Sequence, residues 1–155
     1  MDVSDKDPAL RSLEHEVQRL ARRLRRVSTE RARILDPAVQ PTGWSILVTL
    51  YRSGPQRQSD LCDELRLDKG AVSRQVSALA ELDLVERTPD PEDRRAATVT
   101  LTDEAARRIR EIESEARRWY DGHFDDWSAE EISRVAEDLA RYNEVFENEV
   151  FDKQP

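Results

Sequence analysis

Cysteine, histidine and glycine are scarce in this 155-residue chain, which has one, two and four of them respectively. A single cysteine excludes an intrachain disulfide, and His15 and His123 lie too far apart in sequence to indicate a structural zinc site. The scattered glycines form no phosphate-binding loop, and the histidines have no evident catalytic partner. We therefore expect neither an enzyme nor a protein that needs a cofactor.

Long apolar runs are also missing, and 37% of the residues are charged. No stretch is long enough to span a membrane, and the start of the chain has no signal-peptide pattern. By its length the chain forms one compact unit. We expect a cytoplasmic protein without membrane contacts.

The net charge of −8 is unevenly distributed. Residues 11–33 contain eight arginines and three glutamates, a balance of +5. Residues 103–155 contain eight basic and sixteen acidic groups, a balance of −8, whereas residues 55–101 contain seven basic and ten acidic groups, a balance of −3. If the middle of the chain binds an anion, it must do so through a few well-placed cations, and the binding must depend strongly on salt.

Residues 84–101 have the pattern of a β-hairpin. Apolar and polar residues alternate on both sides of a turn marked by Pro89 and Pro91. The tip ends in Asp93, Arg94 and Arg95. Two adjacent guanidiniums at an exposed tip contribute little to folding, but they suit phosphate or a narrow minor groove. The alternative is a solvated tip with incidental charge.

Two short helices joined by a tight turn are predicted just upstream, over residues 59–66 and from Asp68, as the N-cap, to about Asp83. The second helix has an apolar face, and its opposite face is small and polar. A helix that lies in a major groove needs small side chains for close approach and a few hydrogen-bonding groups. The candidates are Arg74 for a guanine and Lys69, Ser73 and Ser77 for phosphates, with Arg57, Gln58 and Ser59 at the start of the first helix as further phosphate ligands.

These segments resemble the MarR family of bacterial transcription regulators. The resemblance rests on Leu65-Arg66-Leu67-Asp68-Lys69-Gly70-Ala71-Val72-Ser73-Arg74-Gln75-Val76, on Leu82-Asp83-Leu84-Val85-Glu86-Arg87, on Asp90-Pro91-Glu92-Asp93-Arg94-Arg95 and on Val99-Thr100-Leu101-Thr102. It implies a winged helix-turn-helix whose dimers bind palindromic operators, often under the control of small aromatic ligands. It also implies that Asp93 orients the wing, that Arg95, or else Arg94, enters the minor groove, and that Ser73, Arg74 and Gln75 lie at or near the bases.

Two details qualify this resemblance. The helical wheel puts Gln75 nearer the buried edge of its helix than the other two. Asp83 stands where the family often has a glycine, but we expect the turn to form because aspartate tolerates unusual backbone angles.

The ends of the chain are predicted to form amphipathic helices. An N-terminal helix has an apolar seam, and two C-terminal helices are expected to start at Thr102 and at a capping box of Ser128 and Glu131. The predicted fold is therefore mainly α, a winged helix-turn-helix with a two-stranded β wing, flanked by N- and C-terminal helices that form a dimerisation domain. The predicted division is a dimerisation helix in residues 1–35, the winged helix in residues 36–102, hereafter the reader, and dimerisation helices in residues 103–155. The N-terminal seam comprises Leu10, Leu13, Val17, Leu20, Leu24 and Val27.

Three further residues are candidates for a small aromatic effector. Trp44 could stack on an aromatic ring, while His15 or Arg11 could meet a carboxylate, although a tryptophan here is more often a core residue. Cys62 is expected to be a packed residue rather than a redox sensor, because it lies beside Leu61 on the apolar side of its helix.

The arginine-rich run at residues 19–26 is interpreted as the solvated face of a helix paired with the acidic C-terminal helices, in preference to a second nucleic-acid site. The resulting prediction is a homodimeric, DNA-binding repressor associated with the nucleoid. The alternative is a winged helix that contacts proteins and has no specific DNA binding, which the acidic middle of the chain would suit.

Overall fold

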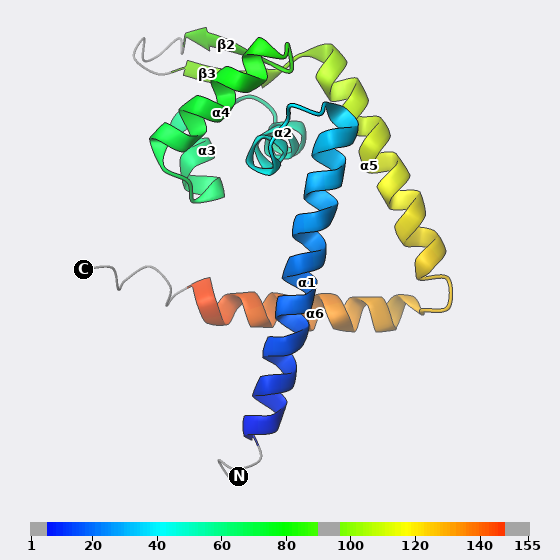
Figure 1. Ribbon diagram of the computed structural model, residues 1–155. Helices are drawn as coiled ribbons and strands as arrows, with labels where there is room; N and C mark the ends of the chain where they lie inside the picture. The colour runs from blue at the N-terminus through cyan, green and yellow to red at the C-terminus, as the bar shows by residue number, and fades with distance from the viewer. Residues whose placement is uncertain (1–5, 90–96, 148–155) are drawn as a thin grey trace, which may run out of the picture. The chain divides into compact units, whose positions relative to one another are not determined.

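The structure, a computed structural model, describes residues 6–89 and 97–147. The described chain forms two compact units, one that ends at Glu113 and one that begins at Ser114, rather than the single unit expected from its length. No described helix is long and apolar enough to cross a membrane. The elements, in chain order, are α1 (Lys6–Leu35), α2 (Pro41–Ser53), β1 (Gln56–Arg57), α3 (Gln58–Leu65), α4 (Lys69–Glu81), β2 (Val85–Pro89), β3 (Ala97–Leu101), α5 (Asp103–His123) and α6 (Ala129–Glu147) (Figure 1).

Helices α3 and α4 form the predicted helix-turn-helix, and α2 packs against them. Helix α4 begins where Asp68 Oδ1 accepts a hydrogen bond from the Ala71 amide at 2.8 Å, so the predicted N-cap is confirmed. Its apolar face is fully buried, with Val72 and Val76 at 0% exposure and Leu79 at 1%. These side chains belong to one core with residues of α2, α3, β3 and the start of α5.

The sheet has three strands in the order β1-β3-β2, rather than the two predicted for the wing. β2 and β3 pair antiparallel with Val85 opposite Leu101 and Pro89 opposite Ala97, which is the predicted hairpin. β1 pairs with the other edge of β3 through Gln56 and Arg57. A two-residue strand is too short to have a visible alternation, so the sequence pattern did not indicate it.

The turn after α4 confirms the expectation for Asp83, whose φ is +55°, in the left-handed region where glycine is usual. Thr102 holds this turn. Its hydroxyl donates to the Asp83 carbonyl at 2.9 Å and its amide donates to the Leu84 carbonyl at 3.1 Å. The same hydroxyl accepts from the Ala105 amide at 3.2 Å and so caps α5, as predicted.

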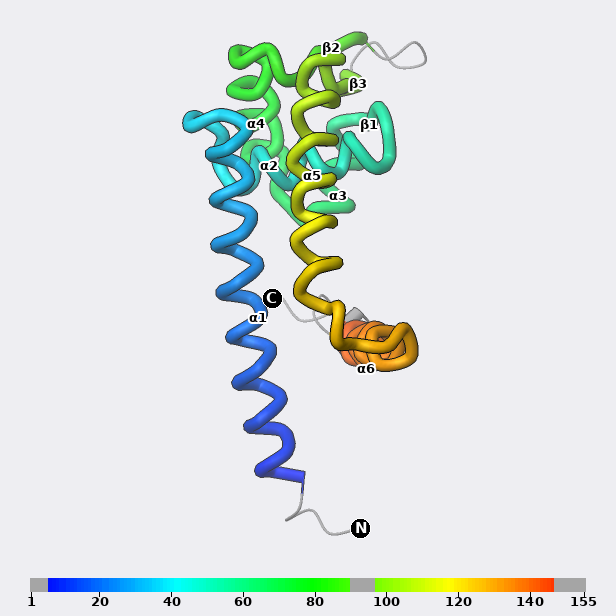
Figure 2. The backbone as a smooth tube through the Cα atoms, turned by 90° about the vertical axis from the view of Figure 1, so that its right-hand side faces the viewer, coloured from blue at the N-terminus to red at the C-terminus, as the bar shows by residue number. Residues whose placement is uncertain are grey.

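Helix α1 is attached to the rest of its unit only at its C-terminal end. Ala32 and Leu35 are its buried residues, and the earlier turns extend away from the reader (Figures 1 and 2). The predicted apolar seam is therefore largely uncovered in the single chain, with Leu10 53% and Leu24 50% exposed.

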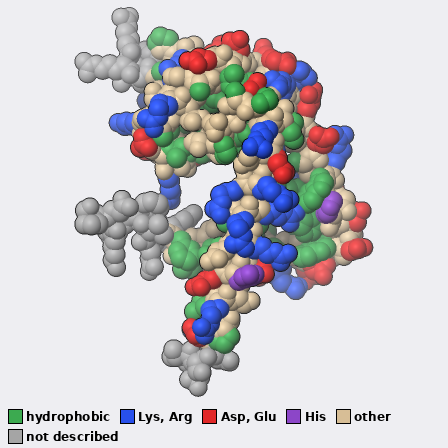
Figure 3. All heavy atoms as spheres, in the orientation of Figure 1, with side chains coloured by type: hydrophobic (Ala, Val, Ile, Leu, Met, Phe, Trp, Pro, Cys, Tyr) green, Lys and Arg blue, Asp and Glu red, His purple; other side chains and the backbone are tan. Residues whose placement is uncertain are grey.

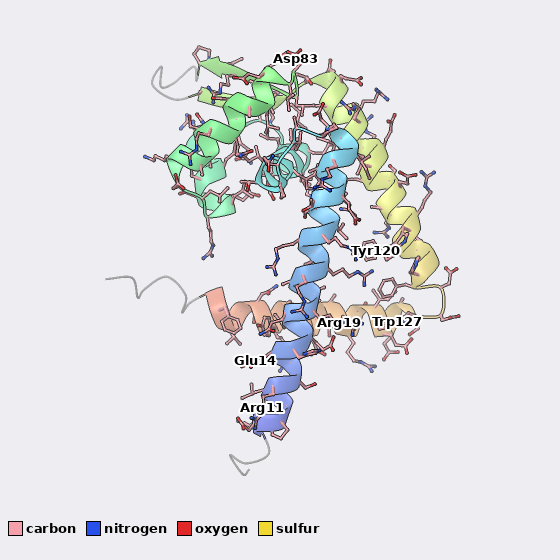
Figure 4. All side chains as sticks on the ribbon, in the orientation of Figure 1. Arg11, Glu14, Arg19, Asp83, Tyr120 and Trp127 are labelled. Atoms are coloured by element: carbon pink, nitrogen blue, oxygen red, sulfur yellow. The ribbon has the colours of Figure 1, made fainter. Side chains whose placement is uncertain are left out.

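The unit that begins at Ser114 has little core of its own. Its aromatic residues contact neighbours that are close in sequence. The ring of Tyr120 stacks on that of Phe124 with centroids 6.0 Å apart, and the ring of Phe124 lies edge-on to that of Trp127 at 5.2 Å (Tyr120 and Trp127 are labelled in Figure 4). The predicted capping box is present, because the Ser128 amide donates to Glu131 Oε2 at 2.8 Å and the Glu131 amide donates to Ser128 Oγ at 3.2 Å. These hydrogen bonds, that from the Ser128 amide above all, lower the pKa of Glu131.

Candidate nucleic-acid interface

The outward face of α4 is small and polar, as predicted. Lys69, Gly70, Ser73 and Arg74 are exposed on it, and the helix is held from behind by its buried face. A Cβ at Gly70 would lie 3.2 Å from Arg74 Nη1 and 3.1 Å from Asp68 Oδ1. The Arg74 guanidinium therefore lies back over the first turn of α4, and the absence of a side chain at position 70 makes room for it.

Ser77 is joined to the wing by Arg87, a residue that the sequence interpretation did not assign to the site. Arg87 Nη2 donates to Ser77 Oγ at 3.0 Å and to the Ser73 carbonyl at 3.1 Å. The Ser77 hydroxyl also donates to the Ser73 carbonyl at 2.9 Å. The period-two alternation already put Arg87 on the same strand face as buried Val85, and an arginine in that register indicates a partner within the protein.

Gln75 lies at the inner edge of α4. Its side chain is half-buried, and its Oε1 is 3.1 Å from the position that a Cβ of Gly43 would occupy in α2. This agrees with the helical wheel rather than with an outward position. A contact between Gln75 and a base stays a prediction.

The start of α3 presents the other predicted phosphate ligands. Gln58 is the first residue of the helix and is half-buried, while Ser59 is exposed and its hydroxyl donates to Asp60 Oδ1 at 3.1 Å. Arg57 is the last residue of β1 and the N-cap residue of α3, so it lies at the start of the helix, as predicted.

The predicted tip residues Asp93, Arg94 and Arg95 lie outside the described residues. β2 and β3 support this tip, since their last described pair is Pro89 opposite Ala97. The roles predicted for the three residues are therefore untested.

On α5, Arg107 is paired with acidic residues of its own helix. Arg107 donates to Glu104 and Glu111, with its shortest contacts at 2.6 Å. The hydrogen bond from Arg107 lowers the pKa of Glu104, and the hydrogen bond from Glu104 is the main cause of a raised pKa for Arg107. The charge of Arg107 is therefore paired with carboxylates within α5.

The arginine-rich run of α1 makes a basic ridge on the surface, formed by Arg19, Arg22, Arg23, Arg25 and Arg26, and visible over the middle of α1 in Figure 3. Two of these arginines pair with glutamates of their own helix, Arg19 with Glu16 at 3.6 Å and Arg26 with Glu30 at 3.5 Å. Helix α1 also pairs with α5 one turn beyond the ridge, where Arg31 Nη1 is 3.1 Å from Glu113 Oε1.

The structure does not bring the three effector candidates together. Trp44 is a core residue at 3% exposure, whereas Arg11 and His15 are exposed on the first turns of α1. Arg11, which is labelled in Figure 4, pairs with Asp7. A hollow of about 390 Å³ does lie nearby, between α1, α2 and the α3–α4 turn. Its lining contains none of the three and consists of Leu24, Arg25, Ser28, Thr29, Pro41, Thr42, Ser45, Leu65 and Leu67.

Neither a metal centre nor a reactive thiol is indicated in the described part of the chain. Among residues 6–89 and 97–147, no three His, Cys, Asp or Glu side chains are grouped so as to hold a metal ion. Cys62 is 9% exposed and belongs to the core, which confirms its predicted packing.

A helix-turn-helix with a β wing, an outward polar face on its second helix and a buried apolar face behind it defines a winged-helix nucleic-acid reader. The sequence pattern of the MarR family matches residues 39–97. An uncharacterized HTH-type transcriptional regulator of Bacillus subtilis, YxaD, is 30% identical over 122 residues, which are 75% of this chain and 85% of that protein. The chain belongs to the MarR family of DNA-binding transcriptional regulators.

Other comparisons agree with this assignment. The HTH-type transcriptional regulator MhqR of Bacillus subtilis is 26% identical over 103 residues, which are 66% of this chain and 71% of that protein. Solved structures share the fold, namely a MarR transcriptional regulator from Methanosarcina mazei (TM-score 0.72, 22% identity, 86% of this chain and 95% of that one) and a MarR protein from Peptoclostridium difficile (TM-score 0.74, 23% identity, 88% of each). Because the relatives are transcriptional regulators, the prediction that the chain is not an enzyme is confirmed.

Proposed function

We propose that this protein is a homodimeric repressor that binds a palindromic operator in the nucleoid and releases it in response to a small aromatic ligand. The observation that carries the proposal is the uncovered apolar seam of the terminal helices. In α6 no described side chain is buried, and Ile132, Val135 and Leu139 are 41–46% exposed. Helices in proteins owe most of their stability to the packing of such a face, so this seam needs a partner.

A second copy of the chain is the partner that the charges favour. Residues 11–33 carry +5 and residues 103–155 carry −8, so α1 of one copy and the C-terminal helices of the other attract each other. The seam of α1 is uncovered like that of α6, and the two supply apolar surface for a shared bundle.

Dimerisation supports a palindromic operator. A two-fold axis gives two copies of α4, and each half-site then lies about one DNA turn, roughly 34–36 Å, from the other. Within each half-site, Arg74 and Ser73 are the proposed base contacts, Lys69, Gln58 and Ser59 the proposed phosphate contacts, and Arg95 the proposed minor-groove contact, with Arg94 beside it and Asp93 orienting the wing. A dimer bound across a promoter represses by excluding polymerase.

The hollow between α1, α2 and the α3–α4 turn supports effector binding better than Trp44, His15 and Arg11 do. It has apolar walls at Leu24, Leu65 and Leu67 and hydroxyls at Ser28 and Thr42. Arg25 lines the same hollow, so its guanidinium is available for a carboxylate.

The test of operator binding is selection from a random-sequence DNA library, followed by footprinting and by a gel shift with the DNA upstream of the protein's own gene. We expect an inverted repeat, two chains per duplex and much weaker binding to a duplex that contains one half-site. Enrichment of no sequence, with binding that nonspecific DNA removes at low salt, would instead favour the protein-contact alternative. A promoter fused to a reporter distinguishes repression from activation.

The test of the effector uses Trp44 as the probe, because it neighbours Ser45 of the hollow in α2. In a Trp119→Phe, Trp127→Phe double variant, Trp44 is the remaining tryptophan of the three in the chain. Titration with simple aromatic acids such as benzoate should quench its fluorescence, and an Arg25→Gln variant should weaken the response. No quenching by any aromatic acid would contradict the proposal.

A further inference from the structure

Arg87 occupies an unusual place for a cation. It comes from β2, where its cross-strand partner is Val99, a core residue at 0% exposure. Instead of pointing to solvent on the far side of the wing, its guanidinium reaches the outward face of α4. It is exposed there, between the helix and the wing.

The two hydrogen bonds to α4 use one end of the guanidinium. Both come from Nη2, one to the Ser73 carbonyl at 3.1 Å and one to the Ser77 hydroxyl at 3.0 Å. Within the described residues, Nε and Nη1 donate to no partner, so three N–H groups remain available on an exposed face. Neither bond neutralises the charge, because a carbonyl and a hydroxyl are neutral acceptors.

We propose that Arg87 is a phosphate-binding residue of the reader, which Ser73 and Ser77 hold in position before DNA arrives. The inference rests on the DNA-binding function and adds a residue to it. A guanidinium fixed at one end loses little conformational entropy on binding, and its free donors match phosphate oxygens. Since residues 55–101 carry a net charge of −3, one such cation is a large share of the attraction for the backbone.

The proposal also changes the role of Ser77. Its hydroxyl accepts from Arg87 and donates its one hydrogen to the Ser73 carbonyl, so no donor is left for a phosphate. Ser77 therefore positions Arg87, and its contribution to DNA binding is indirect.

The experiment measures the affinity of the full-length protein for a duplex that the wild type selects from a random library, at several salt concentrations. Arg87→Gln should weaken binding between about tenfold and a hundredfold, the range for hydrogen bonds to charged groups. It should also lower the slope of log affinity against log salt by about 0.9 per protomer, since one phosphate contact is lost. Arg87→Lys keeps a charge and should restore most of the slope, and Ser77→Ala should weaken binding less and leave the slope unchanged.

The matched control is Arg52→Gln, which removes the same charge from an exposed side chain in α2. It should leave the slope unchanged. Weaker binding by Arg87→Gln with an unaltered slope would mean that Arg87 only braces the wing and would overturn the proposal, as would an equal fall in slope for Arg52→Gln. If the wild type selects no DNA, the proposed DNA-binding function itself is wrong. If the wild type binds DNA and the Arg87→Gln variant binds equally well, only the role of Arg87 is wrong.

Discussion

The reader and the terminal helices have similar amphipathic patterns but opposite states of burial. In the reader, Ile46, Leu47 and Val72 are all at 0% exposure, and their neighbours in the core come from the same chain. In α6 the apolar residues Ile132, Val135 and Leu139 are 41–46% exposed. The helical period of apolar residues therefore predicts that a face will be covered, but it does not predict whether the same chain or another chain covers it. The reader completes its core within the chain, with Ala32 and Leu35 of α1 and Ala105 and Ile109 of α5, whereas the apolar face of α6 stays uncovered.

The largest expected effect is that of a charge in the α6 seam. Leu139→Asp should abolish the dimer, because the carboxylate would be buried in the shared bundle, whereas the reader should stay folded. Operator affinity should fall by more than about a hundredfold as the second half-site is lost. Analytical ultracentrifugation should change from twice the 18.0 kDa of the chain to a single chain.

The control for this substitution is Ser133→Asp, on the opposite side of α6 from the seam, which should remain dimeric. A Leu139→Asp protein that sediments like the wild type would break the comparison, since the seam would then be covered within one chain.

The matching change in the reader is Leu79→Ala. Leu79 is 1% exposed, and its Cδ2 lies 3.4 Å from the position of a Cβ on Gly43, so truncation leaves a cavity between α4 and α2. The free energy of unfolding should fall by about 2–5 kcal/mol, with the dimer intact. Urea denaturation followed by circular dichroism measures this, and a change below about 0.5 kcal/mol would show that the reader core is not the tight one described.

A smaller effect is expected at the turn that closes the reader. Asp83 has φ +55°, so Asp83→Val should destabilise the protein by about 1–2 kcal/mol, because a β-branched residue is strained there. Asp83→Gly should be neutral or stabilising, since glycine adopts this conformation without strain. Thermal unfolding of the two variants gives the comparison, and equal melting temperatures would contradict it.

The basic ridge should matter less still. Replacing Arg22, Arg23 and Arg26 together with Gln should make the dimer somewhat less stable, by about 1 kcal/mol or less as for exposed ion pairs, and should leave operator binding by the dimer unchanged. Gel shifts above the dimerisation concentration test this against Arg95→Gln, which should bind poorly. If the triple variant bound as weakly as Arg95→Gln while remaining dimeric, the ridge would be a DNA contact.

The smallest effect concerns the capping box of α6. Its hydrogen bonds lower the pKa of Glu131 below the ordinary value of 4.5. The resulting stabilisation is complete above pH 4.5 and disappears as the pH falls through the lowered pKa, because protonation then favours the uncapped state. NMR titration should find the Glu131 midpoint below 4.5, and a midpoint unaffected by Ser128→Ala would contradict the hydroxyl's part in this shift.

The sequence predicted the elements whose signals are local. Asp68, Thr102 and the pair Ser128 and Glu131 mark helix starts through their own side chains, and the structure has all three caps. The contacts it missed depend on residues distant in the chain. β1 forms because Gln56 pairs with Val99 of β3. The Ser77 hydroxyl accepts a hydrogen bond because Arg87 reaches it from β2. The three effector candidates do not form one site for the same reason. Trp44 is buried in the core, while Arg11 and His15 are exposed on the first turns of α1.

The junction at Thr102 leaves no slack between the wing and α5. β3 ends at Leu101 and α5 starts at Asp103, so one residue joins them, and that residue is also bonded to the turn that ends α4. A rotation of the first turns of α5 must therefore move α4 as well. If the proposed dimer forms, the spacing of its two α4 helices therefore depends on how α5 is held, and one base pair inserted between the half-sites, which turns one of them by roughly 35°, should weaken binding.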